Sequence, residues 1–166
     1  MTGAAPHKTP SLDRTQQYVT MGLGREIFAV EVRVVREILD LCPVTHLPNT
    51  PDFMLGMIDV RGQAIPVIDL RRKLGLMPVD PTDHTRILVM EFSIGTQELV
   101  IGVVADRVFE VTALDEHAIA APPEIGTRWR SQYIQGIGRR NDTLVIILNL
   151  SELFTQEQAA LISAEA

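Results

Sequence analysis

Cysteine is nearly absent from this chain of 166 residues, in which Cys42 is the single example. One thiol cannot form an intramolecular disulfide, and a thiolate cage for a metal ion needs more ligands. We therefore expect the protein to work in a reducing compartment, the cytoplasm.

Long apolar segments are also missing. No window approaches the roughly 18 uninterrupted apolar residues of a membrane-spanning helix, and the N-terminal residues lack the hydrophobic region of a secretion signal. The sequence thus predicts neither membrane insertion nor secretion.

Positive charge is scarce, because 15 Lys and Arg residues stand against 21 Asp and Glu residues, for a net charge of −6. Binding along a nucleic-acid backbone needs many basic side chains on one face, and the basic clusters at 71–73 and 139–140 are short. We expect no nucleic-acid partner. The apolar share of 46% and the charged share of 22% are typical of a domain that buries a core.

The motifs of common enzymes are missing as well. The four histidines contain no i, i+4 pair, which argues against a metal site. Gly22 and Gly24 lack the third glycine of a dinucleotide-binding loop. We therefore expect no metal ion, no cofactor and no catalytic residue, and we predict a protein that acts through its interfaces rather than an enzyme.

Two catalytic alternatives have a weaker basis. Cys42 could act as a nucleophile with His46 as its base, but a half-buried structural thiol is favoured, because reactive cysteines need an electropositive pocket. Carboxylates beside the predicted strands could pair as acid and base, although such side chains are usually solvated. They are Glu37, Asp40, Asp59 and Asp69.

Short runs rich in Val and Ile, separated by Gly, Pro, Asn or Asp, predict a mainly β protein from Tyr18 onward. Residues 1–14 hold few bulky apolar side chains and are expected to form a flexible tail, so that the folded domain covers 15–166. About ten short strands suit two small barrels better than one large one. The expected strands are 18–23, 27–30, 57–60, 64–70, 86–92, 99–105, 108–111, 133–138 and 143–148.

Several segments need a closer look. Residues 32–41 fit a helix or a strand equally, and 52–55 could form one helical turn. Pro66 cannot donate a ladder hydrogen bond, which places its strand at an edge or leaves its amide side uncovered. Capping-box spacing predicts two helix starts, at Asn149 with Glu152 and at Thr155 with Gln158. A polar connection at 77–83 divides the folded body near its middle.

The segment 59–71 contains an Arg-Gly turn at Arg61, then Pro66, and then Asp69-Leu70-Arg71. This series resembles the signature of the CheW family of bacterial chemotaxis coupling proteins. Two departures from the family pattern are Asp59-Val60 before the turn, where Asn-Leu is typical, and Asn149 in place of a common Asp. Further agreement in order and spacing extends from about residue 17 to 160, at 35–38, 49–51 with Gly56, 102–106, Tyr133 with Gly136, and 148–150.

The resemblance implies two packed five-stranded SH3-like β-barrels with short helices and a C-terminal helix, and it allows strands of the two chain halves to be exchanged. It also implies a cytoplasmic adaptor at membrane receptor arrays. Such an adaptor docks the cytoplasmic tip of a chemoreceptor, a methyl-accepting chemotaxis protein, and the regulatory domain of a chemotaxis histidine kinase. A CheW-like scaffold of a related kinase pathway, for motility or second-messenger control, is the alternative.

The resemblance also implies site residues. A receptor-binding groove would involve Val35, Glu37, Arg61 and Gly102, and we expect Arg61 to pair with Glu37 through a charge-assisted hydrogen bond. Gly102 would allow either close approach by a partner or tight packing between the barrels, and the pattern does not decide. A kinase contact is expected on loops at the barrel ends. These loops are Asn49, Thr50 and Pro51, together with 115–121.

Overall fold

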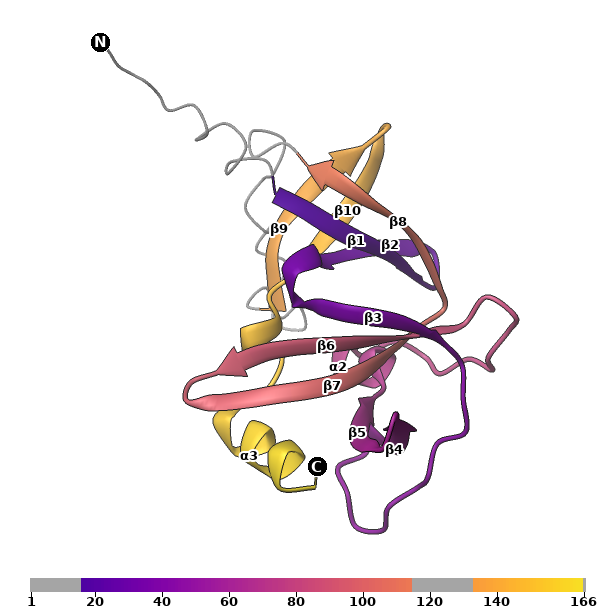
Figure 1. Cartoon of the computed structure of the whole chain (residues 1–166). Coiled ribbons are helices and arrows are strands. Elements are labelled where there is room, and N and C mark those ends of the chain that lie inside the picture. Colours follow the sequence, from indigo (N-terminus) through magenta and orange to yellow (C-terminus); the bar gives the residue numbers. More distant parts are fainter. Residues whose placement is uncertain (1–15, 115–132, 166) are drawn as a thin grey trace.

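The structure, a computed structural model, describes residues 16–114 and 133–165, which form a mainly β protein with two five-stranded sheets (Figure 1). The expected tail at 1–14 and the loop at 115–121 lie outside the described residues. Each sheet is antiparallel apart from one parallel pair of strands, β2 with β10 and β5 with β7. The predicted fold class, two small packed barrels, is confirmed.

We call the first sheet barrel A, with strand order β8-β1-β2-β10-β9, and the second barrel B, with order β3-β6-β7-β5-β4. Barrel A comprises β1 (Gln16–Leu23), β2 (Glu26–Glu31), β8 (Arg107–Leu114), β9 (Ile134–Arg140) and β10 (Thr143–Leu148). Barrel B comprises β3 (Val35–Asp40), β4 (Met54–Val60), β5 (Gln63–Ile68), β6 (Arg86–Ile94) and β7 (Gln97–Ala105).

The chain crosses between the barrels twice. After β2 it passes through a 3₁₀ turn, η2 (Val32–Val34), into β3 of barrel B, and after β7 it returns at Asp106 into β8 of barrel A. Barrel A therefore contains strands from both halves of the chain, which confirms strand exchange. The polar connection at 77–83 joins β5 and β6 of the same barrel, so it does not separate the barrels.

Three groups of buried apolar side chains hold the structure together. Small cores fill the two barrel interiors, around Tyr18 and Ile147 in barrel A and around Ile58 and Val89 in barrel B. The largest core lies between the barrels and draws on both sheets and on the C-terminal segment. Because this shared core is the largest, burial of apolar surface favours the two barrels as one packed body. Its members include Met21, Phe28, Leu88, Ile101, Leu148, Phe154 and Ile162.

Two helices follow capping rules. Asp69 accepts hydrogen bonds from the backbone amides of Arg71 and Arg72 and begins α2 (Leu70–Leu74), which ends at Gly75 with a φ of 77°. The predicted strand 64–70 therefore ends earlier, at Ile68. A reciprocal pair of hydrogen bonds between Thr155 and Gln158, of 3.0 and 3.1 Å, confirms the predicted capping box of α3 (Gln156–Glu165), which packs against β7 (Figure 1).

Two local predictions are wrong. Residues 52–55 form no helical turn, because only Asp52 and Phe53 lie in a turn, closed by a hydrogen bond from Met54 N to Pro51 O at 3.0 Å, and Met54 already begins β4. Asn149 makes no side-chain cap to the 3₁₀ turn η5 (Leu150–Glu152), since its Oδ1 accepts a hydrogen bond from the Ser151 hydroxyl at 2.9 Å.

Of the two alternatives predicted for Pro66, the edge position is wrong, because β5 lies between β4 and β7, whereas the uncovered amide side agrees with the structure. Pro66 is in register with Met57 of β4, and the parallel pairing with β7 begins only at Val67. The missing amide of Pro66 is thus outside the ladder to β7. The segment 32–41, which its pattern left undecided, forms η2 followed by β3.

Candidate interaction surfaces

Arg61 and Glu37, which were expected to pair, are in contact at the edge of barrel B. The guanidinium of Arg61 donates two hydrogen bonds to the carboxylate of Glu37, one of 3.2 Å from Nη1 to Oε1 and one from Nη2 to Oε2. Glu37 lies in β3, Arg61 follows β4, and these are the two edge strands of the sheet. The ion pair therefore links the two edges of barrel B.

The backbone of Arg61 is strained. Its φ is 50° and that of Gly62 is 86°, so both central residues of the turn are in the left-handed region. Asn and Gly are preferred there because the Cβ of other residues crowds the backbone. The Arg61 side chain is 73% exposed and fills no core. Strained positions of this kind cluster at functional sites, which makes Arg61 a candidate contact residue.

The pair also shifts the acid–base equilibria of its members. The hydrogen bond from Arg61 holds the pKa of Glu37 below its usual value against the weaker, opposite effect of burial, and the same bond raises the pKa of Arg61. Because the folded pKa of Glu37 is lowered, its contribution to stability is present above the unfolded pKa. That contribution is lost as the pH falls through the folded value.

Gly102 lies on the same row of the sheet as Glu37, but it is buried. Glu37 is in register with Val89, Val89 with Gly102, and Gly102 with Val67. A Cβ on Gly102 would lie 3.0 Å from Cγ2 of Ile87 and 3.6 Å from Cγ2 of Val67, inside barrel B. This geometry favours the packing interpretation of Gly102, with the packing inside one barrel rather than between two.

Val35 begins β3 and is half-buried against the core between the barrels. The register with β6 shifts between Val35 and Glu37, so that Arg36 is the extra residue of a β-bulge. Arg36 is exposed and lies 3.7 Å from Glu91. Three consecutive residues of β3 thus face the shared core, solvent and the Arg61 turn.

The predicted kinase contact, Asn49 to Pro51, lies in the loop between β3 and β4. Asn49 is exposed and has a φ of 60°, and the Thr50 hydroxyl donates to Leu47 O at 3.3 Å. This hydrogen bond and the left-handed backbone of Asn49 form a turn that presents Asn49 to solvent. Within the described residues, 16–114 and 133–165, no hydrogen bond or ion pair joins this turn to Glu37 or Arg61.

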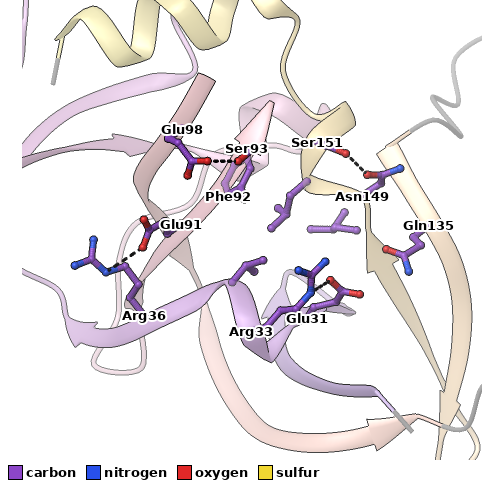
Figure 2. Close-up of a pocket in the computed structure, with 13 residues that line it drawn as sticks. Glu31, Arg33, Arg36, Glu91, Phe92, Ser93, Glu98, Gln135, Asn149 and Ser151 are labelled. Atoms are coloured by element: carbon purple, nitrogen blue, oxygen red, sulfur yellow. Dashed lines mark hydrogen bonds and ion pairs between the residues drawn. The ribbon is translucent and has the colours of Figure 1, made fainter. Parts of the chain in front are cut away.

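A groove of about 630 Å³ opens between the two barrels (Figure 2). Val34, Phe92, Leu148 and Leu150 supply its apolar lining, and the remaining lining side chains are polar or charged. Barrel B contributes Arg36, Glu91, Phe92, Ser93 and Glu98, and barrel A contributes Glu31, Gln135 and Leu148. The groove depends on both barrels, so its shape follows their relative orientation.

Four of the five charged side chains that line this groove form ion pairs (Figure 2). Nε of Arg33 lies 2.8 Å from Oε1 of Glu31, and Nε of Arg36 lies 3.7 Å from Oε1 of Glu91. These are pairs with exposed arginines, which contribute little to stability and can exchange for contacts with a partner. Glu37 and Arg61 do not line the groove, although Glu37 is next to Arg36 in β3.

A second groove, of about 510 Å³, lies between α2 and barrel A. At its wall, the ammonium of Lys73 lies 4.8 Å from the ring centroid of Phe53, 5.1 Å from that of Phe154 and 5.8 Å from that of Tyr133. Nζ also donates to Oε1 of Gln158 at 3.0 Å. Sequence analysis missed this cluster because its members are far apart along the chain and no local pattern connects them.

Sequence analysis also missed an ion pair between Arg71 and Asp106. Both residues belong to stretches that carry the family resemblance, but no spacing rule relates positions separated by 35 residues. Within residues 16–114 and 133–165, no three His, Cys, Asp or Glu side chains gather as a metal site would require. The helices described there are also too short or too polar to cross a bilayer.

The CheW-like domain model matches residues 17–158. The chain is 31% identical over 147 residues to "Chemotaxis protein CheW" of Klebsiella aerogenes, covering 89% of this chain and 86% of that protein. It is 30% identical over 144 residues to "Probable chemotaxis protein CheW" of Rhizobium etli, covering 87% and 90%.

The fold agrees with these matches. The crystal structure of the scaffolding protein TtCheW from Thermoanaerobacter tengcongensis superposes with a TM-score of 0.75 at 31% identity, covering 87% of this chain and 90% of that one. This chain therefore belongs to the CheW-like domain family.

Proposed function

We propose that this protein is a non-enzymatic chemotaxis adaptor, which couples the cytoplasmic tips of chemoreceptors to the regulatory domain of a histidine kinase. The two relatives described above are named chemotaxis proteins, and the structurally similar protein is named a scaffolding protein. Those names favour chemotaxis over the alternative pathways of motility or second-messenger control. The proposed place of action is the cytoplasmic side of the receptor array.

The observation that carries this proposal is the strained, exposed Arg61 with its carboxylate partner Glu37. An arginine in the left-handed region strains the backbone, which Asn or Gly would relax, and its exposed ion pair with Glu37 offsets only a small part of that cost. The bidentate pair instead fixes one cation at the rim of barrel B. A fixed, exposed guanidinium suits recognition of a helical segment that bears carboxylates.

We place the receptor contact along the start of β3. Arg36 lines the groove between the barrels, Val35 packs against the shared core beside it, and Glu37 follows with Arg61 attached. In this arrangement a helical hairpin lies in the groove, with apolar side chains against Phe92 and Leu148 and with its polar edge on the ion pair. Gly102 supports this surface from within barrel B, because it lies on the same strand row as Glu37.

We place the kinase contact on the turn of Asn49, Thr50 and Pro51, which is exposed at Asn49. This separates the two partners onto different surfaces, as an adaptor requires. Signalling interfaces of this kind are often small, so we expect roughly micromolar pairwise affinity that is strengthened by multivalency in the array.

Co-purification with a receptor cytoplasmic fragment and with a kinase regulatory domain tests the proposal. Wild-type protein should bind both fragments, whereas Arg61→Glu should lose the receptor fragment, because it places two carboxylates face to face. The matched control is Arg140→Glu, since Arg140 forms the corresponding ion pair with Glu110 in barrel A. The control should retain receptor binding.

Circular dichroism should show that both variants are folded. Retention of wild-type receptor affinity by Arg61→Glu would contradict the assignment of this surface, and absence of binding by the wild type would contradict the proposed function itself.

A further inference from the structure

Asp106 is the single residue between β7 of barrel B and β8 of barrel A, so it occupies one of the two crossings between the barrels. Its backbone amide donates to Gly22 O at 2.9 Å, which attaches it to β1. Its carboxylate contacts donors from both barrels. Asp106 thus lies where any change in barrel orientation must bend the chain.

Each barrel supplies one donor group to that carboxylate. The amide of Gly24, in the turn between β1 and β2 of barrel A, donates to Oδ2 at 2.7 Å. Nε of Arg71, in α2 after β5 of barrel B, donates to Oδ1 at 3.2 Å, and its Nη2 donates to Oδ2. One carboxylate therefore bridges the two barrels. We refer to Arg71, Asp106 and the Gly24 amide as the Asp106 network.

Arg71 is also fixed from a third side, because its Nη1 donates to Met77 O at 2.6 Å. The Arg71 side chain is only 11% exposed and that of Asp106 is 29% exposed. Partial burial raises the pKa of Asp106. The hydrogen bonds from Arg71 and Gly24, together with the charge of Arg71, lower it by more, so that the net shift of the pKa is downward. The carboxylate thus remains ionised at neutral pH.

A shielded ion pair of this kind contributes more to geometry than to net stability. Desolvation of the charges offsets much of their attraction, whereas the planar guanidinium accepts only a narrow range of carboxylate positions. The apolar core between the barrels lacks this directionality, because burial of apolar surface is not directional. The Asp106 network is a directional contact between surfaces that the apolar core alone would allow to shift.

We propose that the Asp106 network sets the relative orientation of the two barrels and thereby makes Arg71 and Asp106 positioning residues for the groove between them. The groove is lined by Arg36 and Phe92 of barrel B and by Gln135 and Leu148 of barrel A, so its width depends on this orientation. Its consequence for receptor affinity rests on the proposed function.

The first test measures orientation without any partner. Spin labels are placed at Leu144, which is exposed on β10 of barrel A, and at Leu161, which is exposed on α3 next to β7 of barrel B, in a Cys42→Ala background. Pulsed electron paramagnetic resonance then gives the distance distribution. We expect a narrow distribution for the unaltered network and a broader or shifted one for Asp106→Asn and for Arg71→Met.

The matched control is Glu110→Gln, which removes an ion pair within barrel A and should leave the distribution unchanged. A distribution as narrow in both network variants as in the parent would overturn the proposal. Failure of both network variants to fold would overturn it too, because the network would then serve folding rather than orientation.

The second test measures affinity for the receptor fragment. Neither Arg71 nor Asp106 lines the groove, so a loss of receptor affinity in their variants would act through barrel orientation. We expect Asp106→Asn to bind the receptor fragment about tenfold more weakly. Unchanged affinity with a broadened distance distribution would overturn the positioning role. Absence of binding even by the wild type would instead be a failure of the proposed function, and the distance measurement would still decide the orientation.

Discussion

The hairpins β4–β5 and β9–β10 have the same backbone plan in the two barrels. Met54 pairs with Ile68 and Gly56 with Val67 across a bulge in barrel B, and barrel A repeats this with Ile134–Leu148 and Gly136–Ile147. In both hairpins the backbone amide of the residue after the second strand donates a hydrogen bond to the carbonyl of the residue before the first strand. Asp69 N donates to Phe53 O at 2.7 Å, and Asn149 N donates to Tyr133 O at 2.8 Å.

The side chains on these hairpins differ. The left-handed turn is Arg61-Gly62 in barrel B and Asn141-Asp142 in barrel A. After the hairpin, Asp69 caps an α-helix, whereas Asn149 leaves its helix start uncapped by its side chain. Barrel A thus carries a residue suited to the turn, and barrel B carries a strained arginine. The shared backbone plan sets the fold. Arg61, which stands where a left-handed turn prefers Asn or Gly, marks the candidate contact surface.

Ion pairs extend the comparison. Glu37 and Arg61 link the edge strands of barrel B, and Glu110 and Arg140, at 2.7 Å, link those of barrel A. Both sheets are joined edge to edge by a carboxylate and a guanidinium. Only the pair in barrel B has its arginine in a turn with a left-handed backbone.

The largest effect should come from a charge inside a barrel. Gly102→Asp would place a carboxylate against Ile87 and Val67, and we expect a loss of about 3 to 5 kcal/mol in the free energy of unfolding. Gly138→Asp, whose Cβ would lie 3.0 Å from Cδ1 of Leu114, tests the same change in barrel A and should cost a similar amount. Thermal and urea unfolding measure both.

Gly102→Ala is the mild counterpart, with a smaller loss because the side chain of Ile87 can shift. A Gly102→Asp protein of normal stability that failed to bind receptor would show that the packing interpretation is wrong.

The helix caps should give an intermediate effect. Asp69→Ala removes two side-chain hydrogen bonds to α2 and should cost about 1 kcal/mol, whereas Asn149→Ala removes no cap and should cost clearly less. Differential scanning calorimetry on the two variants checks this difference. Equal losses would mean that the hairpin ends are equivalent in energy despite their different contacts.

The smallest effect on stability should be a gain. Arg61→Asn puts into barrel B the residue that barrel A uses at Asn141, and the relaxed backbone should raise the melting temperature by about 2 °C. The same variant should bind the receptor fragment more weakly, because it loses the guanidinium. A lower melting temperature would show that the ion pair with Glu37 outweighs the strain.

Sequence patterns predicted the elements whose signals are local. The hairpin turn at Asn141-Asp142, the buried strand β7 and the capping box of Thr155 and Gln158 each depend on residues close in the chain, and all three are confirmed. Errors occurred where tertiary contacts overrode a local preference. Pro66 sits in an inner strand because β7 pairs only beyond it, and Asn149 bonds to Ser151 rather than to its helix.

The candidate site divides in the same way. The pairing of Glu37 with Arg61 followed from the family resemblance, and the structure brings the two side chains together. The Asp106 network and the aromatic contacts of Lys73 had no local signal, because their members come from segments that meet only after the strands are exchanged.

By itself the sequence determined the strand content, the family and the turn that carries Arg61, since hydrophobic alternation and turn chemistry act over a few residues. Only the tertiary structure decided which strands share a barrel, how the barrels are oriented and where the groove between them opens. Those features depend on long-range pairing and on the burial of a core shared by both barrels, and no stretch of the chain encodes them alone.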